Sequence, residues 1–433
     1  MILAFIAALQ VAVPQAATGV ALQDSIPVVN LADALRLATN LDPNYVAALG
    51  RVKNSEWGRR AAISAFVLPA LTLQGVYQKS NTPSFNVGTG GASRTFVSAS
   101  VIATYELFAG GRRFADLSFA NASLQGARAG QAEARFASAL ITEAAYYDVL
   151  ATTALVEVAR ERLNRAEQQF AIARARVLSG ATVQTDSLQL YTERTRAQVD
   201  LLIERSRLRV ARLNLGSLIG VTYPVNAQPL GIERAPDLPI SREDAVREAL
   251  ETGPQWRVAR ADERAAGAAY KARLSAYLPQ IGLLATTSAF DEVIFPSAIR
   301  RSTISIGVSL PIWDGGRREI AVTQARVNRD VASAIRADLE RSARRDVAFA
   351  FEAYVTSRAA EDLARDALVA AEETYRVQTA RYQAGATDIL NLLEAQFTLS
   401  QAQAGIVTAR QTTQLALAGL EAMLGRRLFP GKE

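Results

Sequence analysis

The chain changes its periodicity within residues 95 to 113, TFVSASVIATYELFAGGRR. Apolar and polar residues alternate in the first part, so that Val97, Val101 and Tyr105 share one face of a predicted strand. From 112 to 223 no proline occurs, and the residues are mainly Ala, Arg, Glu, Gln and Leu, which is typical of a long helix. A strand therefore runs into a helix through the Gly-Gly-Arg step.

The same change recurs in residues 302 to 318, STISIGVSLPIWDGGRR, before a second proline-free stretch from 312 to 429. Strands of about 9 to 11 residues with one apolar face match the requirements of an outer membrane barrel. With two weaker partner segments, four strands are expected, near 70–78, 95–107, 280–290 and 302–313. Four aromatic residues lie near their ends, where a membrane girdle is expected: Tyr77, Tyr105, Phe290 and Trp313.

The two strand-to-helix steps belong to an internal duplication. From Gly111 to Gly180 and from Gly316 to Gly385 the spacing is 69 residues in both halves. Such a conserved length within one chain predicts a rigid element whose length matters. Further segments match in the same order: 30–43 with 241–254, 65–69 with 276–279, 176–182 with 381–387, and 217–220 with 422–425.

Each half is predicted as one helix, two strands, a long helix and a return helix. At 1.5 Å per residue the long helices span about 100 Å, and the first and last helices of each half span about 55 and 60 Å. Two shorter helices end to end can thus lie beside one long helix. The predicted parts are a first repeat at 22–220 with helices at 112–178 and 183–219, a linker at 221–240, a second repeat at 241–425 with helices at 316–382 and 387–424, and a tail at 426–433.

Residues 2 to 13, ILAFIAALQVAV, form a short apolar run before Pro14 and a stretch of small residues. This pattern predicts a secretory signal over residues 1–21. About 12 apolar residues are too few for a membrane-spanning helix, which needs about 20. The signal predicts export from the cytoplasm.

The composition argues against an enzyme. Neither Cys nor His occurs, and no paired carboxylates or nucleophile motif stands out, so we expect no catalytic residue, metal site or cofactor. The net charge of +6 comes from Arg residues spread between Asp and Glu along the helices, which indicates a solvated surface and no nucleic-acid partner. The function is expected to lie in the architecture itself.

Four amphipathic strands cannot close a barrel by themselves. An open sheet edge in lipid leaves backbone N–H and C=O groups unpaired, which costs several kcal/mol for each group. Two chains would supply eight strands and three would supply twelve, and the wider barrel leaves an open lumen. The sequence therefore predicts an oligomer embedded in outer membrane lipid.

The duplication, the proline that ends the helix before each first strand, the Gly-Gly-Arg steps and the Gly-marked turns resemble the TolC-type outer membrane efflux family over residues 30 to 425. The fold class implied is mainly α with a membrane β-barrel. In a homotrimer, this resemblance implies a 12-strand barrel open to the exterior and a 12-helix tunnel across the periplasm. The tunnel would narrow at its tip, dock on a periplasmic adaptor protein, and receive cargo from an inner membrane pump or ABC transporter.

The same resemblance implies a gate at the tip. Its expected residues are Asp186 and Tyr382, which would form a hydrogen bond between neighbouring turns, and Asn391 and Glu394, of which Glu394 would form a carboxylate ring. A basic partner expected two residues after Gly385 is Thr387 in this chain. The tip turns expected to contact the adaptor are Gly180, Ala181, Thr182, Gly385, Ala386 and Thr387.

The leading function is a passive exit duct for drugs or other small molecules in a tripartite efflux system. A duct for type I protein secretion is an alternative, because both kinds of cargo would pass through the same lumen. A soluble periplasmic coiled-coil adaptor or scaffold would explain the helices and the signal but leaves the four alternating strands unexplained.

Overall fold

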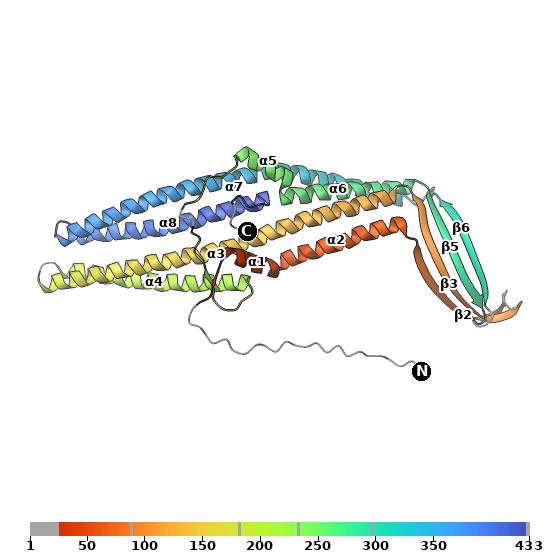
Figure 1. Ribbon diagram of the computed structural model, residues 1–433, viewed down its shortest axis with the longest axis horizontal. Coiled ribbons are helices and arrows are strands. Elements are labelled where there is room, and N and C mark those ends of the chain that lie inside the picture. The colour runs from red at the N-terminus through yellow and green to blue at the C-terminus, as the bar shows by residue number, and fades with distance from the viewer. Residues whose placement is uncertain (1–25, 87–89, 181–182, 232–233, 295–297, 430–433) are drawn as a thin grey trace, which may run out of the picture.

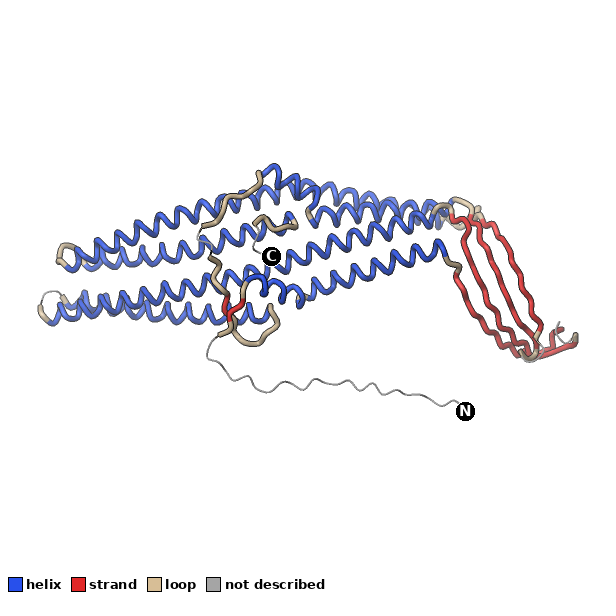
Figure 2. Tube along the Cα trace, in the orientation of Figure 1, coloured by secondary structure: helices blue, strands red, loops and turns tan. Residues whose placement is uncertain are grey.

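The computed structural model describes residues 26–86, 90–180, 183–231, 234–294 and 298–429. The predicted signal and the turn residues Ala181 and Thr182 lie outside these ranges. The described chain is long and narrow, with all long helices running along one axis and a four-stranded sheet at one end of it (Figure 1). Figure 2 shows the same division between blue helices and red strands.

The helices and strands follow the same order in both halves. The first half contains α1 (Leu31–Leu41), α2 (Pro43–Val67), β2 (Ala70–Asn86), β3 (Gly91–Ala109), α3 (Arg112–Leu178) and α4 (Gln184–Leu218). The second contains α5 (Arg242–Thr252), α6 (Pro254–Leu274), the 3₁₀ turn η1 (Ser275–Tyr277), β5 (Gln280–Asp291), β6 (Ile299–Ser309), α7 (Arg317–Gln383) and α8 (Ile389–Leu424). The helices α3 and α7 have 67 residues each, which corresponds to about 100 Å.

The single helix predicted at the start of each half is in fact two helices. In the first half, Asp42 ends α1 and caps α2, accepting a hydrogen bond from the N–H of Asn44, and Pro43 occupies the first position of α2. In the second half the break falls at Gly253, followed by Pro254. Proline lacks the N–H needed inside a helix but fits its first turn, which explains both breaks.

The helices form a wall that is four helices wide at each level. Next to the sheet, α2, α3, α6 and α7 lie side by side, and toward the other end α4, α3, α8 and α7 do so. The two helical hairpins α3/α4 and α7/α8 run to the end of the molecule opposite the sheet, where each turns back at its tip (Figure 1). The long helices α3 and α7 therefore connect the sheet with the tips.

A segment between the halves crosses the middle of this wall. In it β4 (Asn226–Ala227) pairs in parallel with β1 (Val28–Val29). Two fully buried tyrosines anchor the segment: the hydroxyl of Tyr146 donates to the Gln228 carbonyl at 2.7 Å, and that of Tyr354 donates to the Pro236 carbonyl at 2.6 Å. The predicted linker is thus a packed part of the helical region.

The sheet is antiparallel with the order β2-β3-β5-β6. Within the described chain neither β2 nor β6 has a partner on its outer side. The strands β2 and β3 run beyond the predicted residues 70–78 and 95–107, whereas β6 ends before the predicted residue 313. The reason for the early end is that β5 begins at Gln280, opposite Ser309, and that Pro311 cannot donate to a sheet.

Candidate functional site

The strand register separates the sheet into an apolar and a polar face. Residues that are directly opposite in an antiparallel pair project to the same side. Residues that are paired across successive strands form a row on one face. One row contains Leu73, Val101 and Thr287, and the row two residues nearer the helices contains Leu71, Ala103, Ala285 and Ile304. The apolar face comprises Leu71, Leu73 and Tyr77 of β2, Val97, Val101, Ala103 and Tyr105 of β3, Leu283 and Ala285 of β5, and Ile304, Ile306 and Val308 of β6.

This apolar face is uncovered in the single chain. Leu73 and Ile304 are 78% and 79% exposed. Exposed apolar surface of this extent marks an interaction with lipid or protein. The opposite face carries Ser98, Ser100, Thr286 and Ser305 among its residues, which suits contact with water.

The four predicted girdle residues do not share one environment. Tyr77 is 69% exposed on the apolar face, and Tyr105 lies on the same face with its hydroxyl donating to the Phe66 carbonyl at 2.6 Å. Phe290 is opposite Ser98 and therefore lies on the polar face, where its ring is 6.3 Å from that of Phe96. The girdle assignment of Phe290 is thus wrong, because its parity in the strand is opposite to that of Tyr77.

Trp313 lies outside the strand in which it was predicted. It follows the end of β6, in the connection to α7, and is 81% exposed. Of the four predicted girdle residues, Tyr77 and Tyr105 lie on the apolar face of the described sheet. Tyr77 is toward the loops and Tyr105 is toward the helices.

The turns at the helical tips depend on glycine. Gly180 and Gly385 have φ angles of 74° and 73°, a left-handed conformation that glycine adopts at little cost. After Gly385, Asp388 caps α8 by accepting the N–H of Asn391 at 3.0 Å. The Asn391 side chain donates to Thr387 Oγ1 and to Asp388 Oδ1 and so belongs to this cap. Glu394 is exposed one turn further along α8.

Tyr382 is buried inside the tip of a single protomer. It is 5% exposed and packs with Ala173, Leu190, Ile389 and Leu392. Its hydroxyl has no hydrogen-bond partner among the described residues, so the expected hydrogen bond to Asp186 is not formed in this structure. Burial, followed by the nearby Asp186 carboxylate, raises the pKa of the Tyr382 hydroxyl.

The basic contact of Tyr382 comes from a residue that the sequence reading missed. Arg176 of α3 donates from Nη1 to the Tyr382 carbonyl at 3.0 Å, and its guanidinium carbon lies 5.2 Å from the centre of the Tyr382 ring. Seven residues earlier on both helices, Gln169 donates to the Tyr375 hydroxyl at 2.7 Å. These two contacts join α3 to α7 at the same sequence separation of 206 residues. Arg176 is therefore a basic residue at the tip that contacts Tyr382 within one protomer.

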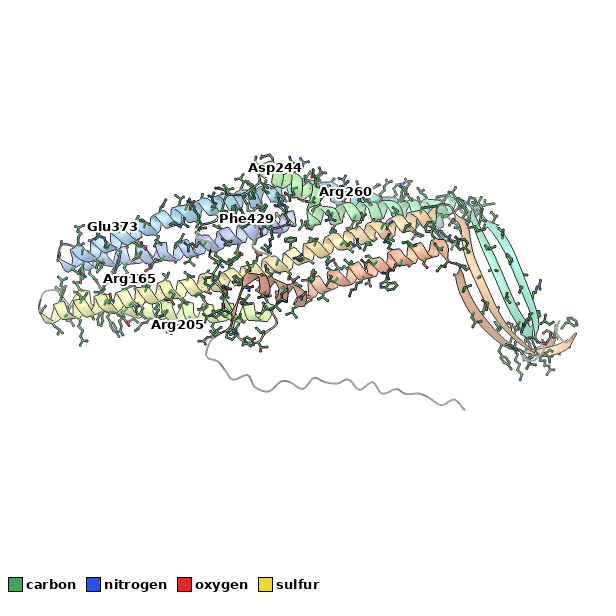
Figure 3. All side chains as sticks on the ribbon, in the orientation of Figure 1. Arg165, Arg205, Asp244, Arg260, Glu373 and Phe429 are labelled. Carbon is green, nitrogen blue, oxygen red and sulfur yellow. The ribbon has the colours of Figure 1, made fainter. Side chains whose placement is uncertain are left out.

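A third polar contact joins the hairpins further from the tip. Arg165 donates from Nη2 to Gln403 of α8 at 3.0 Å, and Figure 3 shows it between the two hairpins. Elsewhere charged side chains project outward along the helices, as Glu373 and Arg205 do in Figure 3. Toward the tips the hairpins are thus joined by these polar contacts and by the packing around Tyr382.

The hairpins are joined differently at the middle of the molecule. Glu143 of α3 and Glu421 at the end of α8 are fully buried, and Arg427 forms ion pairs with both, at 2.7 Å to Glu421. The N–H of Leu428 also donates to Glu421, at 2.9 Å. Burial, followed by the Glu143 carboxylate, raises the pKa of the adjacent Tyr147 hydroxyl. The predicted tail at 426–433 thus contains a residue that ties the two halves together.

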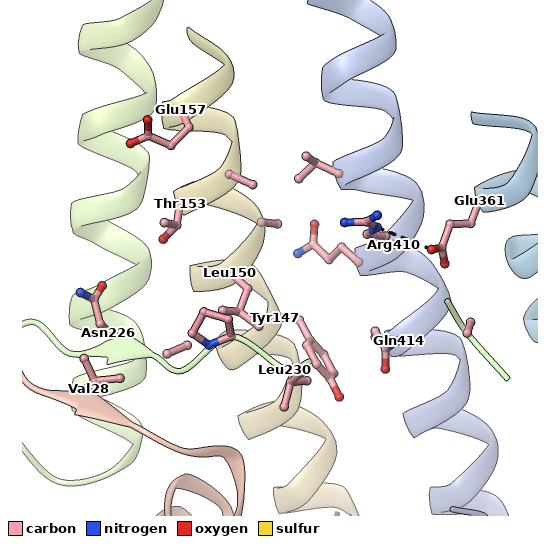
Figure 4. A pocket seen from close by; sticks show the side chains of 17 residues that line it. Val28, Tyr147, Leu150, Thr153, Glu157, Asn226, Leu230, Glu361, Arg410 and Gln414 are labelled. Carbon is pink, nitrogen blue, oxygen red and sulfur yellow. Dashed lines mark ion pairs between the residues drawn. The ribbon is translucent and has the colours of Figure 1, made fainter. Parts of the chain in front are cut away.

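A cavity of about 550 Å³ lies between α3 and α8, on the tip side of this cluster (Figure 4). Tyr147, Leu150 and Glu157 line it from α3, and Gln414 and Arg410 line it from α8. Arg410 also forms an ion pair with Glu361 at 3.6 Å. Among the described residues no three Asp or Glu side chains are arranged to hold a metal ion.

A family model described as outer membrane efflux protein matches residues 34–221 and 245–426. The chain belongs to the outer membrane efflux protein family. This efflux protein is accordingly placed in the bacterial outer membrane, with its helices in the periplasm. The match covers both helical hairpins and all four strands of the sheet.

Characterised relatives of the efflux protein include the outer membrane efflux protein BepC of Brucella suis, with 27% identity over 65% of this chain and 62% of the relative. The outer membrane protein OprJ of Pseudomonas aeruginosa is 27% identical over 71% of this chain and 66% of its own length. The cobalt-zinc-cadmium resistance protein CzcC of Cupriavidus metallidurans is 25% identical over 73% of this chain and 74% of its own length. The chain spans a little under two thirds of the length of the first two relatives.

Solved structures share the fold. The outer membrane protein VceC of Vibrio cholerae aligns with a TM-score of 0.78 at 19% identity, over 92% of this chain and 97% of that one. The open state of the MtrE outer membrane channel of Neisseria gonorrhoeae aligns with a TM-score of 0.76 at 21% identity, over 93% of this chain and 90% of that one. The predicted family is therefore confirmed, and the mainly helical fold with a small sheet is that of outer membrane channels.

Proposed function

We propose that three copies of the chain assemble into one channel, each contributing four strands to a 12-strand barrel. The observation that carries this proposal is the four-stranded sheet, which has an exposed apolar face and unpaired strands β2 and β6 at both edges. In lipid these edges must pair, since their backbone groups find no water there. Pairing β6 of one protomer with β2 of the next satisfies both edges at once.

The polar face of the sheet then lines the barrel lumen, and the apolar face meets lipid. A wall four helices wide in each protomer gives a ring of 12 helices on the same threefold axis. The long helices would extend the lumen by about 100 Å into the periplasm. The assembly would be a passive duct with no catalysis of its own.

The tips form the gate of this duct. The contacts of Arg176 with Tyr382 and of Gln169 with Tyr375 hold the α7/α8 hairpin against α3 in each protomer. Opening requires these contacts to break so that α7/α8 can move outward. Glu394, which is exposed near the tip of α8, would form a ring of three carboxylates that favours cations.

A periplasmic adaptor would dock on the tip turns around Gly180 and Gly385, including Ala386 and Thr387. The energy would come from an inner membrane pump bound to the adaptor. The names of BepC, an efflux protein, and of CzcC, a cobalt-zinc-cadmium resistance protein, support small solutes as cargo. We therefore propose the exit duct of a tripartite efflux system.

Reconstitution tests this function directly. The detergent-extracted chain is expected to have the mass of a trimer and to form channels in planar bilayers. Addition of the cognate adaptor should raise the open probability. A stable, water-soluble monomer of the processed chain would exclude the channel function.

A further inference from the structure

The outer end of the apolar sheet face carries two exposed basic side chains. Lys79 lies two residues beyond Tyr77 on β2, and its partner in β3 is Thr95. Arg300 lies near the start of β6, opposite Ala289 of β5. Both basic side chains are exposed, and neither forms an ion pair with another described residue.

The register places both residues on the lipid side of the sheet. Lys79 has the same parity as Leu71, Leu73 and Tyr77. Arg300 belongs to the row that runs through Ala289 and Ala99 to Gly75, between Leu73 and Tyr77. Among the paired residues that the structure describes, these two are the exposed charges of the apolar face.

The nearest carboxylate on this face is already bonded. Asp291 is 3% exposed and accepts hydrogen bonds from Asn86 Nδ2 at 3.3 Å and from the N–H of Glu292 at 2.7 Å. It therefore does not offer an exposed anionic partner to the two basic side chains. Their counter-charge must come from outside the described chain.

The two residues belong to the edge strands β2 and β6, which become neighbours when adjacent protomers close the barrel. The sheet leans so that β6 lies farther from the helices than β2 (Figure 1). A row of paired residues followed from β2 to β6 therefore moves away from the helices. Over three strand spacings of about 4.8 Å, at a strand tilt of about 40°, the shift along the barrel axis is about 9 Å. Lys79 lies four residues beyond Gly75, which raises it by about 10 Å at the same tilt.

Lys79 of one protomer and Arg300 of the next therefore stand at nearly the same height on neighbouring strands. Tyr77 lies just below Lys79, and the ring of a tyrosine marks the boundary between hydrocarbon and headgroups. Because the loop end of the sheet faces away from the periplasmic helices, this boundary belongs to the outer leaflet. Lipid phosphates are the anionic groups that the two basic side chains would meet at this height.

We propose that Lys79, Arg300 and the Thr95 hydroxyl form a phosphate-binding site for a phosphorylated outer-leaflet glycolipid, one at each junction between protomers. Arg can bind two phosphate oxygens at once, and Lys adds a second positive charge. The long aliphatic stems of both residues can lie along the apolar face while their charged ends reach the phosphate. A lipid bound in this way bridges two protomers and stabilises the trimer.

This proposal rests on the trimeric barrel proposed above, and native mass spectrometry of the purified channel tests both separately. The probes are diphosphoryl lipid A, monophosphoryl lipid A and phosphatidylethanolamine, each added to delipidated protein. We expect the wild type to bind diphosphoryl lipid A most tightly, monophosphoryl lipid A less tightly and phosphatidylethanolamine least tightly. The Lys79→Ala/Arg300→Ala double variant should bind diphosphoryl lipid A about tenfold more weakly than the wild type. The matched control is Arg301→Ala, because Arg301 is opposite Ser288 on the polar face.

The outcomes are distinct. The site is supported if Arg301→Ala and the charge-conserving Lys79→Arg/Arg300→Lys variant still bind diphosphoryl lipid A more tightly than phosphatidylethanolamine. The double alanine variant should lose this preference. A conducting trimer that binds lipid A and phosphatidylethanolamine equally, or a double alanine variant that binds as the wild type does, overturns it. Absence of a trimer in the spectra overturns the proposed channel, and the lipid site falls with it.

Discussion

The two helical hairpins are joined at the middle of the molecule and at their tips by contacts of different kinds. At the middle, fully buried Glu143 and Glu421 share Arg427, and the apolar cores around Tyr146 and Tyr354 surround this cluster. At the tips the hairpins meet through a small buried cluster around Tyr382 and through a few polar contacts, of which that of Arg176 is the last. The difference indicates a fixed end and a releasable end, so that the α7/α8 hairpin can move about its middle.

The largest effect is expected at the fixed end. Arg427→Met leaves two buried carboxylates without their cation, which should destabilise the protein by about 3 to 5 kcal/mol. The measurement is the temperature at which the trimer dissociates on a gel. Arg426→Met is the matched control, because Arg426 is exposed and pairs with Glu248 at the surface, where an ion pair contributes about 0 to 1 kcal/mol. Equal losses in both variants would contradict a special role for the buried cluster.

A smaller loss is expected for Tyr354→Phe, which removes the hydrogen bond to the Pro236 carbonyl and should cost about 1 kcal/mol. Burial raises the pKa of the Tyr354 hydroxyl from 10.0 to about 12. A raised pKa favours the neutral form in the fold, so this contribution is complete below pH 10 and is lost as the pH rises to about 12. The stability difference between wild type and variant should shrink across that range, whereas Tyr223→Phe, at an exposed residue, should show no such trend.

At the releasable end, Arg176→Ala should lower stability by no more than about 1 kcal/mol, the usual contribution of one hydrogen bond. Its main effect should be on the gate, because it removes the last contact between α3 and α7. We expect a higher single-channel conductance in planar bilayers. Arg174→Ala provides the control, since Arg174 is exposed two residues earlier on the same helix. Unchanged conductance in Arg176→Ala would show that the tips are held by other contacts.

The smallest effect is expected for Tyr382→Phe. Its hydroxyl has no hydrogen-bond partner among the described residues, so the change should alter stability by less than about 0.5 kcal/mol and leave conductance unchanged. The hydrogen bond that the family resemblance implies between Asp186 and Tyr382 would instead give a higher conductance for Asp186→Ala combined with Tyr382→Phe. Measuring both variants beside Arg176→Ala decides which side chain holds the tips.

The sequence predicted what depends on periodicity. Alternation over residues 95 to 107 and the absence of proline after Gly111 located a strand and a long helix, because each pattern covers many residues. Short-range effects shifted the boundaries: Pro43 and Pro254 divide the first helix of each half, and Pro311 shortens β6. Patterns of period two or 3.6 average over such single residues and therefore miss them.

The candidate site was less accessible to sequence reasoning. Phe290 was assigned to the membrane girdle because it lies near a strand end, but strand parity, which the pairing with Ser98 fixes, places it on the other face. The contact of Arg176 with Tyr382 joins residues 206 apart. The heptad spacing of Gln169 and Arg176, repeated in Tyr375 and Tyr382, contained this information, but reading it requires knowing that α3 and α7 are in contact.

The pairing of β1 with β4 sets an order for biogenesis. Val28 and Val29 have their partners at Asn226 and Ala227, so this small sheet can form only when nearly 200 intervening residues have crossed the inner membrane. The first half can then close on itself while the second is still being exported. Arg427, which is among the last of the described residues to emerge, then joins Glu143 of the first half to Glu421 of the second. The first half thus closes early and the last exported residues join it to the second half, so the protomer can mature in two stages before it meets its partners.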